Sequence, residues 1–77
     1  MPTLLRRYGY RFHFFSAEPD EPPHIHVDGH GAKMKVWLRD LTVAKEAGFR
    51  DNDRRRILAT LREERESLLE AWNEQFG

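Results

Sequence analysis

The sequence contains no cysteine among its 77 residues. This absence excludes a disulfide scaffold, thiolate metal ligands and a thiol nucleophile. No stretch approaches the roughly 20 consecutive apolar residues that a membrane-spanning helix requires, and no apolar N-terminal segment is typical of a signal peptide. These absences predict a cytoplasmic protein with no membrane partner.

Apolar residues are scarce as well. Hydrophobic residues make up 39% of the chain and charged residues 34%, against roughly 45–50% apolar and about 25% charged residues in typical globular domains. Aromatic residues nevertheless reach 12%, and disordered segments generally lack them. A chain this short buries only about 60% of the surface that it exposes when unfolded. We therefore predict a single folded domain over residues 1–77, with a thin core that a partner or a second copy would stabilise.

Charge of neither sign is in excess, because 13 Lys and Arg residues balance 13 Asp and Glu residues. This balance is an average over unlike segments. Residues 1–16 carry three basic and no acidic side chains, and residues 17–32 carry four acidic side chains and no Lys or Arg. Residues 33–50 carry five basic against two acidic side chains, and the remainder carries five against seven. Zero net charge therefore does not exclude a charged partner.

Alternating polar and apolar residues predict strands in the first two thirds of the chain. The aromatic-rich run 8–15 and the runs 24–30 and 32–38 have the period of two that half-buried strands show. Turn residues at 29–31 join the last two runs into a predicted hairpin. The acidic, proline-rich stretch 18–23 predicts an extended, exposed loop.

Two further segments are less regular. Residues 3–6 fit either an earlier strand or the start of the first one. Residues 39–49 fit a turn followed by a short strand or a helical turn. We therefore expect a sheet of three or four strands.

The C-terminal third predicts one long amphipathic helix. No Gly or Pro interrupts residues 51–75, and Asp51 or Asn52 can cap the N-terminus. One stripe at spacings of three and four carries apolar side chains (Ile57, Leu58, Leu61, Leu68, Leu69, Trp72 and Phe76). The predicted fold class is α+β, with a small antiparallel sheet packed against this helix.

Period two assigns the strand residues to two faces. The face that packs against the helix is predicted to carry apolar side chains (Tyr10, Phe12, Phe14, Ile25, Val27, Met34, Val36 and Leu38). The opposite face is predicted to carry all four histidines with cations, two aromatics and one acid (Arg11, His13, Phe15, His24, His26, Asp28, His30, Lys33, Lys35, Trp37 and Arg39). The sequence thus indicates a basic, histidine-rich sheet surface.

His24 and His26 are the candidate residues for chemistry. At about 3.3 Å per residue they lie roughly 6.6 Å apart on one strand face. Two imidazoles at that spacing can converge on a metal ion, or can act as general acid and base in RNA cleavage, because histidine titrates near neutral pH. They can equally be polar residues on a solvated strand. We predict no metal and no cofactor from one such pair.

The predicted binding residues are Arg11, His24, His26, Lys33, Lys35 and Trp37. Cations can follow phosphates and aromatics can stack on unpaired bases, so the set suits RNA. Trp and Arg are also common in protein–protein interfaces. Because the chain has no overall basic excess, we favour a protein interface over RNA.

Several segments, taken in order, resemble a known family. They include Gly9-Tyr10-Arg11-Phe12, Glu21-Pro22-Pro23-His24-Ile25-His26-Val27, Ala47-Gly48-Phe49 and Leu68-Leu69-Glu70-Ala71-Trp72. Their order is similar to that of short bacterial and archaeal proteins catalogued only as a domain of unknown function, and the resemblance covers nearly the whole chain. It implies no established activity, and it maps the family's histidine motif onto His24 and His26.

The resemblance also implies a genetic setting, because members are often encoded beside another small protein in an arrangement similar to toxin–antitoxin pairs. We therefore expect a non-enzymatic interaction module that binds a small partner protein or a second copy of itself. The alternative is an RNA-binding or RNA-cleaving protein that uses the basic, histidine-rich sheet face.

Overall fold

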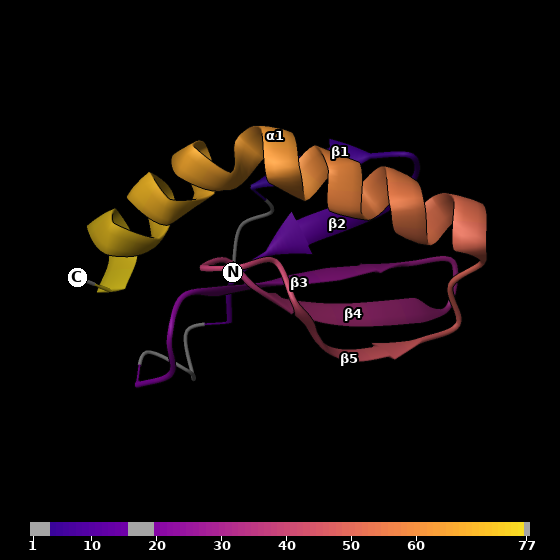
Figure 1. The fold of residues 1–77 in the computed structure, drawn as a ribbon, viewed down its shortest axis with the longest axis horizontal. Coiled ribbons are helices and arrows are strands. Elements are labelled where there is room, and N and C mark those ends of the chain that lie inside the picture. The colour runs from indigo at the N-terminus through magenta and orange to yellow at the C-terminus, as the bar shows by residue number, and fades with distance from the viewer. Residues whose placement is uncertain (1–3, 16–19, 77) are drawn as a thin grey trace.

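The computed structural model describes residues 4–15 and 20–76, which form one five-stranded sheet and one long helix (Figure 1). The elements in chain order are β1 (Leu5–Arg7), β2 (Tyr10–His13), β3 (His24–Gly29), β4 (Ala32–Trp37), β5 (Val43–Ala47) and α1 (Asp51–Phe76). The strands lie in the order β1-β2-β3-β4-β5, and every neighbouring pair is antiparallel. Each strand therefore pairs with the next along the chain, and α1 lies across one face of the sheet.

The α+β class with one long C-terminal helix is confirmed, but the sheet has five strands rather than three or four. One additional strand is β1, which is separate because Tyr8 and Gly9, with φ of 58° and 82°, reverse the chain before β2. The other is β5, in a segment whose sequence also fitted a helical turn. Thr3 of the expected N-terminal strand, and Glu18 and Pro19 of the predicted loop, lie outside the described residues.

The core lies between α1 and one face of the sheet. All eight strand residues that were predicted to face the helix are buried, which confirms that part of the face assignment. Four residues of the predicted helical stripe are buried with them, and the other three pack partly buried at its margin (Leu58, Leu69 and Phe76). No helix within residues 4–15 and 20–76 is long and apolar enough to span a membrane.

Polar contacts at several points connect α1 to the sheet. Arg54 forms an ion pair with Glu46 of β5 at 2.9 Å, and the hydroxyl of Tyr10 donates to Asp53 at 3.2 Å. Arg65 donates from Nε to the carbonyl of Leu38 at 2.7 Å and from Nη2 to the carbonyl of residue 39 at 2.6 Å. The helix thereby fixes the turn that follows β4, and it leaves the other face of the sheet open.

Candidate functional site

The candidate site is the open face of the sheet, on the side away from α1. The strand register aligns four of its side chains in one row across β2, β3, β4 and β5, in the order His13, His26, Lys35 and Lys45. Neighbouring strands lie about 4.8 Å apart, so this row is roughly 14 Å long. We call it the His–Lys row. It contains no acidic residue.

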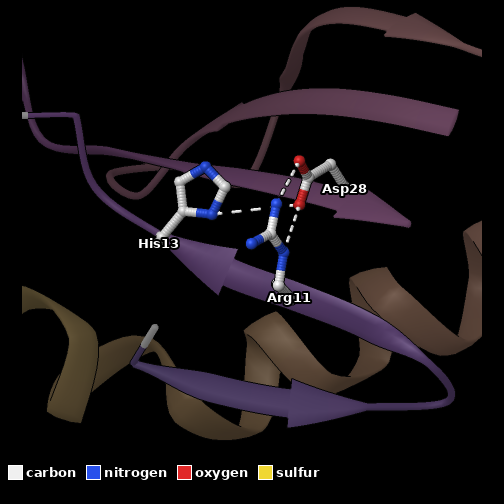
Figure 2. A network of polar contacts seen from close by, with 3 residues as sticks. All are labelled: Arg11, His13 and Asp28. Atoms are coloured by element: carbon white, nitrogen blue, oxygen red, sulfur yellow. Dashed lines mark hydrogen bonds and ion pairs between the residues drawn. The ribbon is translucent and has the colours of Figure 1, made fainter. Parts of the chain in front are cut away.

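A second row runs beside it and contains the one acid of the strands on this face. Its members, in order across the sheet, are Arg6, Arg11, Asp28, Lys33 and Ala47. Arg11 donates to both oxygens of Asp28, from Nε at 3.2 Å and from Nη2 at 3.0 Å (Figure 2). We call this the Arg–Asp row. Its acid is satisfied by Arg11, and no described residue forms an ion pair with Lys33.

His13 belongs to the His–Lys row and also approaches Asp28 of the Arg–Asp row. It is only 7% exposed, and its Nδ1 lies 4.0 Å from a carboxylate oxygen of Asp28 (Figure 2). Burial lowers the pKa of His13 below the ordinary value of 6.5, and nearby His26 and Arg11 lower it further, whereas Asp28 acts in the opposite direction. The imidazole is therefore neutral at pH 7, with one ring nitrogen a hydrogen-bond donor and the other an acceptor.

His26 is the direct cross-strand neighbour of His13 and forms part of an aromatic stack. Its ring centroid lies 6.0 Å from that of His13 and 4.1 Å from that of Phe15, with the rings close to parallel in both pairs. Phe15 is 45% exposed although it is a large apolar side chain. The stack therefore presents a flat aromatic surface on a face that is otherwise polar.

Two hollows adjoin this stack. The smaller one, of about 140 Å³, lies among His13, Phe15, His26, Asp28 and Lys33. The larger one, of about 400 Å³, extends towards β5 and is lined by three lysines with His26 and Glu46 (Lys33, Lys35 and Lys45). His26 and Lys33 line both hollows, so the two lie next to each other on the open face.

Lys35 and Trp37 lie together on β4. Lys35 Nζ lies 2.6 Å from a carboxylate oxygen of Glu21 and 4.8 Å from the centre of the Trp37 ring. The Lys35 side chain is only 12% exposed. The charge of Lys35 is therefore balanced by Glu21, whereas no described residue forms an ion pair with Lys45.

The prediction that all four histidines lie on this face is wrong for His30, and His24 shares the face only as a buried residue. His24 is fully buried, with its ring 5.0 Å from that of Trp72 and 5.6 Å from that of Trp37. Its Nδ1 lies 2.9 Å from the carbonyl oxygen of Pro22, to which it donates in the tautomer protonated there. Its ring also lies 5.2 Å from that of His26, so the alternation of β3 holds, and His24 is buried because the end of α1 covers this end of the strand.

His30 is the histidine that lies elsewhere. It is in the turn after β3 with φ of 50°, and its ring packs edge-on against Tyr10 of the core face at 5.1 Å. The turn directs the chain away from the alternation of β3. Of the other predicted binding residues, Arg11, His26, Lys33 and Lys35 lie together on the open face.

Lys45 is a site residue that the sequence did not identify. Residues 43–47 form a strand, and its register places Lys45 opposite Lys35 on the open face. The sequence signal that could have identified Lys45 was the possibility that residues 39–49 contain a short strand. Among the described residues, no group of three or more His, Asp or Glu side chains is arranged to hold a metal ion.

Comparison with known proteins yields one match. The family described as Domain of unknown function (DUF4160) matches residues 9–73. No curated protein matches the chain, and no solved structure matches it. The matched region contains both rows of the open face except Arg6.

Proposed function

The chain belongs to the DUF4160 family of domains of unknown function, and we propose that it is a non-enzymatic interaction module whose open face binds an acidic partner protein. The observation that carries this proposal is the state of Lys33 and Lys45. Both line the larger hollow, and no described acid pairs with either. A carboxylate of a partner supplies the missing opposite charge.

The aromatic side chains of the face supply an apolar anchor for the same partner. Phe15 is exposed and stacked on His26, and large rigid aromatics commonly contribute most of the binding energy at interfaces. Cations around such an anchor steer an acidic partner and raise the association rate. The arrangement on this face therefore combines affinity from Phe15 with selectivity from the lysines.

We further propose that the partner is a small protein encoded nearby, as in a toxin–antitoxin-like pair, and that the two act in the cytoplasm. The resemblance to proteins encoded in such pairs supports this setting. The short chain supports it too, because a domain of this size gains stability from any ligand that binds only the folded state.

Co-expression with the adjacent gene product, followed by size-exclusion chromatography, tests the proposal. We expect the two proteins to elute together and the complex to dissociate at high salt. The double variant Lys33→Glu with Lys45→Glu should abolish co-elution. Arg62→Glu, a charge reversal at an exposed position on the helix, is the matched control and should retain it. Separate elution of the unmodified proteins would count against the proposal.

RNA is the second candidate, favoured by one specific observation. The Phe15–His26 stack lies in the same hollow as Lys33, so a base could stack on Phe15 while a phosphate binds the lysine. Stacking of one base on an aromatic side chain contributes about 1–3 kcal/mol. An RNA-cleaving version would depend on His13 and His26, because His24 is enclosed in the core.

A binding measurement separates RNA from the protein partner. Single-stranded RNA binding should weaken steeply with salt and should be lost in Phe15→Ala. If no RNA binds at low salt, the RNA candidate is removed. RNA binding at the same face with no protein complex would instead replace the protein partner.

A further inference from the structure

Strand β5 is the longer of the two edges of the sheet and the less covered one. At the other edge, β1 has three residues, and its Arg7 forms an ion pair with Glu64 of α1 at 3.4 Å. β5 has five residues, of which residues 44–47 are all exposed. It forms the last strand of the sheet, so no described strand pairs with its outer side (Figure 1). An edge of this kind presents unpaired backbone N–H and C=O groups to a further strand.

The charges on β5 differ between its two faces. On the helix side, Glu46 is held by Arg54 through both carboxylate oxygens, at 2.9 and 3.0 Å. On the open face, Lys45 lies directly opposite Lys35 of β4. Glu21 already balances the charge of Lys35. The positive charge that remains for an added strand on the open face is therefore that of Lys45.

We propose that β5 binds an extended acidic segment of the partner protein as a sixth strand. The inference rests on the proposed function and specifies how the partner binds. Residues directly opposite on neighbouring strands share a face, with Cβ atoms about 4.5–5.5 Å apart. A carboxylate of the added strand opposite Lys45 therefore lies within reach of the lysine, in the regular stretch 45–47 that follows the register shift at Ala44. The small side chains of Ala44 and Ala47 leave room on either side of it.

Lysine on an edge strand commonly prevents unwanted pairing with apolar strands. In this sheet the charge of Lys45 makes the edge selective for acidic strands. An added acidic strand forms an ion pair with Lys45, whereas an added apolar strand only removes water from the lysine. The added strand should alternate in character. Its acidic residues lie on the open face over the lysines, and its apolar residues lie on the helix side.

A second copy of the chain fits this edge poorly. In a two-fold symmetric antiparallel pairing of β5 with itself, the axis is perpendicular to the sheet, so opposed residues must belong to the same face. Val43 pairs with Val36 of the core face, across a register shift at Ala44, so Lys45 would then oppose Lys45 or Ala47 of the copy, but not Glu46. The lysine gains no carboxylate in either of these registers, and one of them opposes like charges.

Binding of designed peptides tests the strand addition. Three eight-residue peptides carry a fluorophore: one alternates Val and Glu, one alternates Val and Lys, and one has four Val followed by four Glu. We expect the alternating acidic peptide to bind about tenfold or more tightly than either of the others, as measured by fluorescence anisotropy. The variant Lys45→Glu should reverse the preference towards the Val–Lys peptide. Equal binding of the alternating and block acidic peptides would overturn the proposal.

Proline substitution tests the backbone pairing with the lysines left in place. Successive residues of a strand direct their N–H groups to opposite sides, so in the regular stretch 45–47 the substitutions Glu46→Pro and Ala47→Pro remove donors from different sides of β5. An inward-facing N–H pairs with β4, so its loss lowers the thermal midpoint more than the loss of an outward-facing one. The variant with the higher thermal midpoint has therefore lost the outward-facing donor, and it should no longer bind the alternating acidic peptide. Amide hydrogen exchange of the unmodified protein should slow at outward-facing amides of β5 when the peptide is added. Unchanged exchange, or unchanged peptide binding by the folded proline variant, would refute strand addition.

The same variants separate the two proposals. If the double lysine variant disrupts the complex with the adjacent gene product while the folded proline variant does not, the open face binds the partner and β5 does not receive a strand. If neither change affects that complex, both proposals are wrong. Protection of β5 amides that rises with protein concentration, with no peptide present, would make the occupant a second copy instead.

Discussion

The imidazole of His24 and the indole of Trp72 lie with their ring centroids 5.0 Å apart inside the core. Neither side chain is more than 5% exposed. Trp72 also contacts Phe14 at 5.1 Å and Phe76 at 4.2 Å, so the histidine closes an aromatic cluster between the start of β3 and the end of α1. His24 therefore contributes to stability, and its neighbour His26 is the histidine of the motif that the open face presents.

The two histidines should respond differently to truncation. His24→Ala removes a buried ring and leaves its hydrogen-bonding neighbour unsatisfied, so we expect the free energy of unfolding to fall by about 2–3 kcal/mol. His26→Ala should cost less than about 1 kcal/mol, because that ring lies at the surface. Urea denaturation of both variants measures the difference. Equal losses of stability would contradict the buried role of His24.

Reversing the charge of Lys45 should stabilise the isolated protein. Lys45→Glu places a carboxylate opposite Lys35 in place of a second ammonium, and cross-strand pairs of opposite charge contribute roughly 0.2–1 kcal/mol. We expect a gain at the low end of that range, because Glu21 already balances Lys35. Thermal unfolding measures it, with Lys45→Gln as the control that removes charge only. Lower stability of Lys45→Glu than of Lys45→Gln would contradict this interpretation of the lysine pair.

The stability of the protein should depend on pH through His13. Its pKa in the folded protein lies below the ordinary value of 6.5, chiefly because of burial, so protonation favours the unfolded chain. This contribution to stability is present above pH 6.5 and is lost as the pH falls from there through the folded pKa. We expect His13→Gln to reduce the loss of unfolding free energy between about pH 7.5 and pH 5.5. An unchanged pH dependence in that variant would assign the effect to other groups.

Removing the charge of Asp28 should lower the pKa of His13 further. The carboxylate lies 4.0 Å from the imidazole and acts against the effect of burial, so Asp28→Asn removes the group that favours the protonated ring. Titration followed by NMR of the ring protons measures the shift. Asp40→Asn, which alters a carboxylate bound to Thr42 in another part of the fold, should leave His13 unchanged. A rise in the pKa of His13 in Asp28→Asn would overturn the assignment.

The turn after β4 should depend on the planar fork of Arg65. The guanidinium bonds two successive carbonyl groups at 2.7 and 2.6 Å, which the ammonium of lysine cannot reproduce with the same geometry. We expect Arg65→Lys to lower the free energy of unfolding by about 1–2 kcal/mol. Arg62→Lys is the matched control, and its unfolding midpoint should stay unchanged. Equal midpoints for the two variants would show that the fork adds nothing to stability.

The helix and the core face of the sheet could be predicted from the sequence because both depend on local periodicity. Residues 51–75 carry an apolar stripe without interruption, and the alternation of β2, β3 and β4 assigns each side chain to a face. Strands β1 and β5 are harder to predict. Three residues are too few to show a period, and β5 has apolar or small residues at both kinds of position.

The composition of the site was harder to predict for a different reason. Alternation gives the face of a residue, but burial depends on what the rest of the chain brings over it. His24 is enclosed by Trp72, which is far away in sequence, and Lys45 joins the site only through its register with Lys35. Such long-range pairings arise when the elements pack together, and no local pattern contains them.

The separation of the two faces has a consequence for engineering the protein. Because core and open-face residues occupy alternate positions of the same strands, the open face can be randomised as a set while the apolar positions stay fixed. A library varied at Arg11, His26, Lys33 and Lys45 would present a continuous surface on a scaffold without cysteine. Selection from such a library could direct this small sheet towards new targets while the packing that holds it together is retained.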